Sequence, residues 1–314
     1  MTAVEPAPVS ASAPPAMGAH AYFGGAIVPF EAATVSIATH SLQYGTAVFE
    51  GIRAYLQEDG GTALLFGREH YQRLVRNARL LRATIPESAD ALVEITLELL
   101  RRNAHGGDVY IRPIIYKAAT SLRPQLTGLD DRTAIYTFPL GDYLPTAGIR
   151  ATISGWQRVP DNAIPARGKI SGAYVNSSLA AEDAHAGGYD DAIMLTGDGH
   201  VAEASAANVF VVTGRELATP PLVDDVLPGI TRSAVITIAR DAGYDVVERR
   251  VDRSELYVAD EVFLTGTGVQ VAPIASIDDR PIGDGFPVAL DIQRRYFAAV
   301  RGTDPRYADW LTRI

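Results

Sequence analysis

The stretch ARGKISGAYVNSSLAAEDA, residues 166–184, contains Lys169, one of only two lysines in the chain. The other is Lys117, and the remaining basic residues are all arginines. Arginine serves a solvated positive charge equally well, but its guanidinium stays protonated, whereas a primary amine can attack a carbonyl and form a Schiff base. Lys169 is therefore either an ordinary surface lysine or a nucleophilic amine. The small residues beside it, Gly168 and Gly172, would let a backbone segment or a planar ligand approach closely.

The composition is typical of a soluble globular protein with a large core. Of its 314 residues, 47% are hydrophobic and 21% are charged, and this length is enough for two domains of ordinary size. The net charge of −9 disfavours nucleic acid and anionic membranes as partners, because there is no basic surplus to neutralise phosphates. The lack of cysteine excludes disulfides and thiolate metal sites, and the six histidines show no paired metal-ligand spacing, so we expect no metal.

Residues 1–20 are rich in alanine, proline and serine. They lack the basic region and the continuous apolar core of a signal peptide. No run of 18 apolar residues that could span a membrane occurs in the chain. We therefore expect a disordered N-terminal tail on a cytoplasmic protein.

Strand and helix patterns alternate along the whole chain. In the first half, the sequence predicts a strand pair at 21–30, a strand and an amphipathic helix within 61–85, a helix at 88–103, and strands at 108–118 and 132–140. In the second half, it predicts strands at 149–156, 191–197, 208–212, 245–251 and 260–268, and helices at 174–188 and 231–243. Ser88 or Asp90 is the candidate N-cap of the second helix.

The mixture of strands and helices predicts an α/β or α+β protein with two domains rather than one continuous doubly wound sheet. The turn-rich segment GDYLPTAG, residues 141–148, is the best candidate for a boundary. We therefore expect a smaller N-terminal domain over 21–138, an interdomain loop over 139–148, and a larger C-terminal domain over 149–314.

Two further segments contain residues suited to chemistry. Glu203 lies among small residues in VAEASAANVF, so its carboxylate either faces water in a turn or pairs with a buried cationic nitrogen. In LPGITR, Pro228 and Gly229 end a strand, and Thr231 begins a helix. The exposed amides of such a helix start could bind a phosphate, although Thr231 could be only an N-cap. The small-residue turn at 264–268 could supply more donors.

Eight segments, taken in order, resemble the branched-chain amino acid aminotransferases, which are class IV aminotransferases. They are HSLQYGTAVFEGIRAY at 40–55, REHYQRL at 68–74, YIRPIIY at 110–116, GDYL at 141–144, GKISGAYVNSSLA at 168–180, VAEASAANVF at 201–210, LPGITR at 227–232 and DEVFLTGTG at 260–268. The resemblance runs from about Tyr22 to past Pro273. It implies the two-domain fold type IV architecture of pyridoxal-phosphate enzymes, similar to that of D-amino acid aminotransferase, with the C-terminal domain binding the cofactor.

The resemblance also implies roles for individual residues. Lys169 would hold pyridoxal 5'-phosphate as a Schiff base and then move the α-proton of the substrate. Tyr174 would bind the phenolic oxygen of the cofactor, and Glu203 would pair with its pyridine nitrogen. The other implied cofactor contacts are Arg73, Leu227, Gly229, Ile230, Thr231, Gly266 and Thr267. The implied substrate pocket consists of Tyr44, Phe49, Gly51, Tyr110, Arg112, Tyr143, Thr267 and Gly268.

The implied reaction is a ping-pong transfer of the amino group of L-leucine, L-isoleucine or L-valine to 2-oxoglutarate. Apolar walls with a few polar groups suit both an aliphatic side chain and the distal carboxylate of glutamate. Tyr110 and Arg112 alternate on one predicted strand and should therefore face the same side. The family also implies a homodimer or a higher assembly, with Tyr44 reaching the pocket of the neighbouring copy.

Two departures from the family pattern leave alternatives open. The loop KAATSLRPQLTGLDD at 117–131 replaces a glycine-rich loop that can cap the pocket, and Ala206-Ala207 replaces a Gly-Glu pair. A class IV transaminase acting on D-amino acids or (R)-amines, or an aminodeoxychorismate-lyase-like enzyme, would share the fold and the cofactor. A cofactor-free Schiff-base aldolase and a noncatalytic binding protein are alternatives of a different kind, and both would leave Glu203 and Thr231 without a role.

Overall fold

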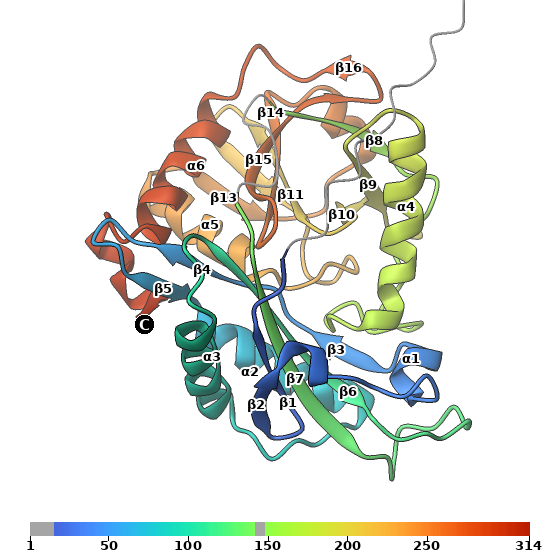
Figure 1. Cartoon of the computed structure of the whole chain (residues 1–314). Coiled ribbons are helices and arrows are strands. Elements are labelled where there is room, and N and C mark those ends of the chain that lie inside the picture. Colours follow the sequence, from blue (N-terminus) through green and yellow to red (C-terminus); the bar gives the residue numbers. More distant parts are fainter. Residues whose placement is uncertain (1–15, 142–147) are drawn as a thin grey trace, which may run out of the picture.

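The computed structural model describes residues 16–141 and 148–314, and these residues form two β-sheets with helices packed on them (Figure 1). The first sheet runs in the order β17 (Leu311–Arg313), β5 (Thr62–Leu65), β4 (Ile52–Leu56), β6 (Val109–Lys117), β7 (Asp131–Pro139), β1 (His20–Phe23) and β2 (Ala26–Pro29), and β3 (Ala47–Phe49) also pairs with β6. All the pairings in this sheet are antiparallel.

The second sheet is mixed. Its order is β10 (Val201–Ala204), β9 (Asp191–Leu195), β8 (Ile149–Ile153), β15 (Gln270–Ile277), β14 (Glu261–Gly266), β11 (Asn208–Thr213), β12 (Glu216–Thr219) and β13 (Asp245–Glu248), and β16 (Arg280–Pro281) pairs with β15. The parallel pairs are β8 with β9, β8 with β15, and β12 with β13. The expectation of a mixed α/β fold with more than one sheet is confirmed.

The helices are α1 (His40–Tyr44), α2 (Gly67–Ala78), α3 (Ala89–Asn103), α4 (Tyr174–Ala186), α5 (Ile230–Asp241) and α6 (Pro287–Val300). Short 3-10 turns occupy 30–32, 79–81, 171–173, 253–257 and 305–310. The Ser88 side chain accepts a hydrogen bond from the amide of Ala91 and is the N-cap of α3, as expected. None of the described helices is long and apolar enough to cross a membrane.

Helices α2 and α3 cover the first sheet because each has an apolar face. Leu74, Leu92 and Leu99 on these helices are fully buried in one core with strand residues such as Ile52 and Ile111. Leu81, which the sequence placed in the same helix as Leu74, lies instead in the 3-10 turn after α2. That turn ends at Arg82, whose φ of 50° is left-handed and stops the helix.

A second core joins the two halves of the chain. Tyr55 and Leu65 of the first sheet pack with Phe210 and Phe263 of the second sheet and with buried residues of α5 and α6. The last strand, β17, pairs with β5 and so returns the C-terminus to the first sheet. Most strands of the first sheet therefore come from the proposed N-terminal domain, 21–138, and the strands of the second sheet come from the proposed C-terminal domain, 149–314. Strand β17 is the exception, because it lies in the C-terminal range but belongs to the first sheet.

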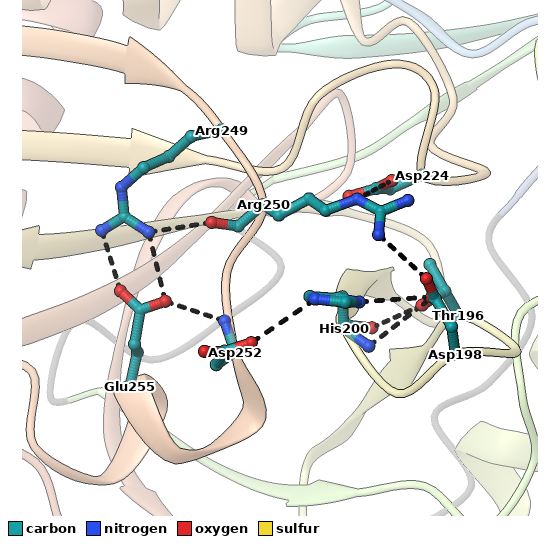
Figure 2. Close-up of polar contacts among 8 residues, drawn as sticks. All are labelled: Thr196, Asp198, His200, Asp224, Arg249, Arg250, Asp252 and Glu255. Atoms are coloured by element: carbon teal, nitrogen blue, oxygen red, sulfur yellow. Dashed lines mark hydrogen bonds and ion pairs between the residues drawn. The ribbon is translucent and has the colours of Figure 1, made fainter.

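A polar network holds the edge of the second sheet on which β10 lies (Figure 2). His200 contacts the carboxylates of Asp198 and Asp252, at 3.3 and 3.5 Å. Arg250 pairs with Asp198 and also with the buried Asp224. The network ties the turn before β10 to the segment after β13 and to the loop at 220–229. Both β10 and that loop line the cavity described next.

Candidate active site

One cavity of about 380 Å³ brings together side chains from both sheets. Of the site residues expected from the sequence, those that line it are Phe49, Gly51, Arg73, Tyr110, Arg112, Lys169, Tyr174, Glu203, Leu227, Gly229, Ile230, Thr231, Gly266, Thr267 and Gly268. Tyr44 is not among the lining residues, and Tyr143 lies outside the described part of the chain. Seven of the eight segments that resembled one family therefore contribute residues to a single cavity.

Lys169 points into this cavity from the segment just before α4. Its Nζ donates a hydrogen bond to the Tyr174 hydroxyl at 2.5 Å and lies 4.9 Å from the ring centres of both Phe49 and Tyr174. The backbone beside it is fixed to β3, because the amide of Phe49 donates to the Lys169 carbonyl at 3.0 Å. Lys169 is thus half-buried, and its amine lies between two aromatic rings. No carboxylate of a described residue forms an ion pair with it.

The segment after Lys169 packs closely against the backbone at Gly45. Gly172 donates its amide to the carbonyl of Gly45, which has a φ of 64°. A Cβ on Gly45 would lie 2.6 Å from the Cα of Gly172. Glycine at position 45 therefore leaves room for the backbone of the segment that follows Lys169.

Glu203 lies inside strand β10 and is buried, so it is not a turn carboxylate facing water. Its Oε1 pairs with Arg158 at 2.9 Å, and its Oε2 accepts from the Asn208 side chain at 3.0 Å and from the Leu227 amide at 3.1 Å. Burial raises the pKa of Glu203 in spite of Arg158 and the Leu227 amide, which lower it. A cationic group in the cavity would therefore be a favourable additional partner for this carboxylate.

Arg73 on α2 is buried, so it is not an exposed helix arginine. Its Nε and one terminal nitrogen donate to the two oxygens of Glu50 at 2.6 and 2.7 Å, and the other terminal nitrogen donates to the Pro228 carbonyl at 2.6 Å. His70 donates to the same Glu50 carboxylate at 2.8 Å. Two of the five guanidinium protons of Arg73 therefore have no partner among the described residues.

The contacts within this cluster determine whether Glu50 and His70 carry a charge. Burial by itself would raise the pKa of Glu50, but the charge and hydrogen bonds of Arg73, together with the hydrogen bond of His70, lower it below its ordinary value. Burial lowers the pKa of His70 and outweighs the opposing effect of Glu50. Glu50 is therefore ionised and His70 neutral, so Arg73 and Glu50 form a buried ion pair that His70 supports as a neutral donor.

Helix α5 begins at the cavity and has no side-chain cap. The amides of Ile230 and Thr231, the first two residues of the helix, have no hydrogen-bond partner among the described residues. Arg73 meets this helix start through the Pro228 carbonyl. Unpaired amides, the positive end of a helix dipole and a nearby guanidinium together suit a phosphate.

Aromatic rings and one arginine form the other wall of the cavity. Tyr110 and Arg112 face the same side of β6, as expected, because Arg112 donates to the Tyr110 hydroxyl at 2.9 Å. The guanidinium of Arg112 stacks on the ring of Phe49 at 4.7 Å, and its buried Nε has no partner among the described residues. A side chain at Gly51 would collide with the Tyr110 hydroxyl, so glycine is required there.

The loop that departs from the family pattern does not line this cavity. It packs against α1 instead, since the Tyr44 hydroxyl donates to the Leu122 carbonyl at 2.7 Å, and His40 contacts the Arg123 carbonyl. Tyr44 is 42% exposed. Within one copy of the chain, this loop and Tyr44 lie on the surface.

Sequence reasoning missed four residues that fix the site: Glu50, His70, Arg158 and Asn208. Glu50 and His70 lie inside segments that were matched to the family, and a charged residue between apolar ones in FEGIR was a usable signal of a buried pair. Arg158 follows an irregular stretch, and nothing in its neighbours indicates that it meets Glu203. Among the described residues, no group of three or more His, Asp or Glu side chains could hold a metal ion.

Comparison with known proteins gives a consistent result. The family model "Amino-transferase class IV" matches residues 47–277. A protein of Aquifex aeolicus described as a probable branched-chain-amino-acid aminotransferase is 49% identical over 94% of this chain and 96% of its own length. The branched-chain aminotransferase of Thermoproteus uzoniensis, solved with norvaline, is 39% identical, with a TM-score of 0.91 over 94% of this chain and 98% of that one.

Another branched-chain amino acid aminotransferase has been solved in complex with N-(5'-phosphopyridoxyl)-L-glutamate. It is 41% identical to this chain, with a TM-score of 0.90 over 94% of this chain and 98% of that one. The fold and the sequence pattern therefore agree with the same group of proteins.

The buried cluster predicts how stability depends on pH. Because the pKa of His70 is lowered in the folded chain, the unfolded chain binds more protons once the pH falls below the ordinary histidine value of 6.5. The stabilising effect of a neutral His70 is thus complete above pH 6.5 and declines below it. His70→Asn keeps a donor beside Glu50 but does not titrate, so the variant should lose less stability than the wild type between pH 7 and pH 5.

Urea unfolding of both proteins at each pH measures this difference. His105, whose pKa burial also lowers, is present in both and cancels in the comparison. Equal loss of stability in the two proteins over this range would contradict the assignment of a neutral, buried His70.

Proposed function

This chain belongs to the class IV aminotransferases, and from this premise we propose that it transfers the amino group of L-leucine, L-isoleucine and L-valine to 2-oxoglutarate. It is a branched-chain-amino-acid aminotransferase that depends on pyridoxal 5'-phosphate. The proposal depends on the cavity, which brings together the Lys169 amine, the buried Glu203 carboxylate and the open start of α5. Its aromatic wall also carries Arg112, whose Nε has no partner among the described residues.

The residues present fit this cofactor. Lys169 offers a primary amine, Tyr174 a hydroxyl 2.5 Å from it, and Glu203 a buried carboxylate with room for a cation. Arg73 and the uncapped start of α5 offer donors for a phosphate. When bound, pyridoxal 5'-phosphate supplies an aldehyde that takes up an amine and a ring that accepts the electron pair left when the α-proton departs.

Lys169 is the residue that would hold the cofactor and move the proton. An unprotonated Nζ would accept the α-proton of the donor amino acid and pass it on within the same half-reaction, and in the second half-reaction it would supply the α-proton of the new amino acid. The hydroxyl of Tyr174 orients the amine, and the ring of Phe49 covers it from the other side. The rings of Phe49 and Tyr174 both lie 4.9 Å from Nζ and would shield part of the amine from water during these transfers.

Glu203 would keep the ring nitrogen protonated. Its pKa is raised by burial, so its negative charge is costly without a cationic partner. Arg158 and Asn208 hold the carboxylate in place from the side of the second sheet. The Glu203 carboxylate would stabilise the protonated form of the ring nitrogen, which would help the ring to accept electrons.

Arg112 explains how one cavity would accept both leucine and glutamate. Phe49 and Tyr110 present apolar surface to an aliphatic side chain. The guanidinium of Arg112 keeps an unpartnered Nε among the described residues and can bind the distal carboxylate of glutamate or 2-oxoglutarate. Two substrates that use one cavity must bind in turn, which requires a ping-pong order.

The assembly we propose is a homodimer or a higher homo-oligomer in the cytoplasm. Apolar side chains are exposed around α1: Val35, Ile37, Leu42, Tyr44 and Leu122. Within this α1 patch, the Tyr44 hydroxyl donates to the Leu122 carbonyl and so joins α1 to the loop that contains Leu122. Exposed apolar clusters of this kind are typical of protein interfaces, and a second copy here would place Tyr44 at the boundary between the two chains.

Lys169→Arg should lower the rate of transamination between L-leucine and 2-oxoglutarate by roughly 1,000-fold or more, because the positive charge remains but the primary amine is lost. Lys117→Arg is the matched control and should retain activity, since Lys117 is buried in an ion pair with Asp131 away from the cavity. Steady-state assays measure both. Sustained turnover by the Lys169 variant, or a wild type that prefers D-alanine or an (R)-aryl amine, would refute the proposal.

Arg112→Met should raise the KM for 2-oxoglutarate by about tenfold or more, the expected loss for one charge-assisted contact. The KM for L-leucine should rise less, because its side chain needs no cation. The ratio of the two KM values in the variant and the wild type is the measurement. A ratio that does not change would remove Arg112 from the acceptor site.

Ile37→Asp should shift the protein toward the monomer, because Ile37 is 89% exposed in one chain and a charge there cannot be buried in an interface. Val258→Asp, at an equally open position outside the α1 patch, should leave the assembly unchanged. Sedimentation velocity distinguishes the species. A fully active wild-type monomer would show that no dimer is needed.

A further inference from the structure

Tyr296 on α6 is a buried tyrosine whose hydroxyl contacts the start of α5. Its side chain is 1% exposed and belongs to the apolar core that joins the two sheets. Helices α5 and α6 pack side by side (Figure 1), and the Tyr296 hydroxyl forms a hydrogen bond with the hydroxyl of Thr231, the second residue of α5. Thr231 lines the cavity, whereas Tyr296 does not. The Tyr296 hydroxyl therefore reaches the cavity only through Thr231.

Two further buried side chains extend this contact away from the cavity. The Tyr296 hydroxyl lies 3.5 Å from the hydroxyl of Tyr55 on β4, at the long end of the hydrogen-bonding range. The Nε2 of Gln270, at the start of β15, donates to the Tyr55 hydroxyl at 3.3 Å. Both residues are buried, and neither lines the cavity. Gln270, Tyr55, Tyr296 and Thr231 thus form one chain of hydrogen bonds, the Tyr296 chain, which ends at the cavity.

The Gln270 amide fixes the direction in which the Tyr296 chain donates. An amide NH₂ group can only donate, so the Tyr55 oxygen accepts from it. The Tyr55 proton is then left for Tyr296, and the Tyr296 proton for Thr231. Burial raises the pKa of both tyrosines, so both hydroxyls keep their protons near neutral pH and can act as donors. With its oxygen accepting from Tyr296, Thr231 has its own proton free for a group in the cavity.

A hydroxyl donor at this position suits a phosphate. A phosphate ester carries close to two negative charges at about pH 7, and its oxygens accept hydrogen bonds. The amides of Ile230 and Thr231 are unpaired at the same helix start. Each donor in a chain polarises the next, so Thr231 becomes a stronger donor when Tyr296 donates to it. In the opposite orientation, Thr231 would donate to Tyr296 and present only lone pairs to the phosphate.

We infer that Tyr296 is a positioning residue that directs the Thr231 hydroxyl to the phosphate of the cofactor. The inference rests on the proposed function, which places that phosphate at the start of α5. Tyr296 touches no ligand and acts through one hydroxyl. It should therefore affect the binding of the phosphate and leave the Lys169 amine and the aromatic wall of the cavity unchanged.

The test compares two ligands that differ only in the phosphate. Pyridoxal 5'-phosphate and pyridoxal share the ring and the aldehyde, but pyridoxal has a hydroxyl in place of the phosphate. The full chain is depleted of cofactor, and the dissociation constant of each ligand is measured from its visible band, or from the ratio of its release and uptake rates. Tyr296→Phe should raise the constant for pyridoxal 5'-phosphate by about fivefold or more, the loss expected for one hydrogen bond, and that for pyridoxal by less than about twofold.

A double-mutant cycle shows whether Tyr296 acts through Thr231. Thr231→Val alone should weaken the binding of pyridoxal 5'-phosphate selectively. Tyr296→Phe added to Thr231→Val should then raise the dissociation constant by less than about twofold, because no hydroxyl remains to be directed. Tyr55→Phe breaks the chain one step earlier, and it should weaken the binding of pyridoxal 5'-phosphate by about two- to fivefold without affecting pyridoxal. That variant decides the question if Tyr296→Phe does not fold.

Tyr307→Phe is the matched control. Tyr307 is a buried tyrosine of the same apolar core, and its hydroxyl donates to Asp241, the last residue of α5, at 2.8 Å. It does not line the cavity, and its contact lies at the opposite end of α5 from Thr231. The variant should leave both dissociation constants unchanged.

A loss of the same size for both ligands in Tyr296→Phe would overturn the inference, because Tyr296 would then support only the general structure of the site. An unchanged constant for pyridoxal 5'-phosphate would also overturn it, as would a Tyr296→Phe effect that persists in full beside Thr231→Val. A wild type that binds pyridoxal 5'-phosphate no more tightly than pyridoxal would overturn both the phosphate site and the role of Tyr296. A wild type that binds the cofactor selectively but does not react with L-leucine would refute the proposed function alone.

Discussion

The buried ion pair between Glu50 and Arg73 is the interaction on which the site depends. It joins the residue after β3 to helix α2, and Arg73 extends it to the Pro228 carbonyl at the start of α5. The first sheet is thereby connected to the second at the point where unpaired amides gather. Because guanidinium stays charged at any ordinary pH, the pair persists only if Glu50 stays ionised, and the neutral His70 donor supports that state.

The five residues FEGIR at 49–53 show how much of the cavity one short stretch organises. Phe49 covers Lys169, Glu50 fixes Arg73, Gly51 leaves room for the Tyr110 hydroxyl, and Arg53 holds the turn at 267–269. The second sheet supplies the opposite wall through β10, which the polar network around His200 keeps in place. The cavity therefore combines residues of both sheets, which suits chemistry that needs several groups held at once.

Much of the fold could be predicted from the sequence, because hydrophobic periodicity reports burial along one element. The helix at 88–103 and its Ser88 cap are an example. Strand β10 was missed because alternation is absent where every residue is buried, and Glu203 was therefore open to interpretation as a turn residue. Pairing partners that are distant in the chain, such as Arg158 for Glu203 and Glu50 for Arg73, leave no local pattern. The family resemblance located cavity residues, but it did not locate the residues that hold them.

The central claim is that Lys169 carries the cofactor and acts on L-amino acids. The most direct measurement is the visible absorption spectrum of the purified protein with pyridoxal 5'-phosphate, recorded before and after L-leucine is added. The account predicts a visible band from the lysine-bound cofactor that L-leucine removes as the aminated cofactor forms. A band that L-leucine leaves unchanged would contradict the substrate assignment, and the absence of any band would contradict the assignment of Lys169.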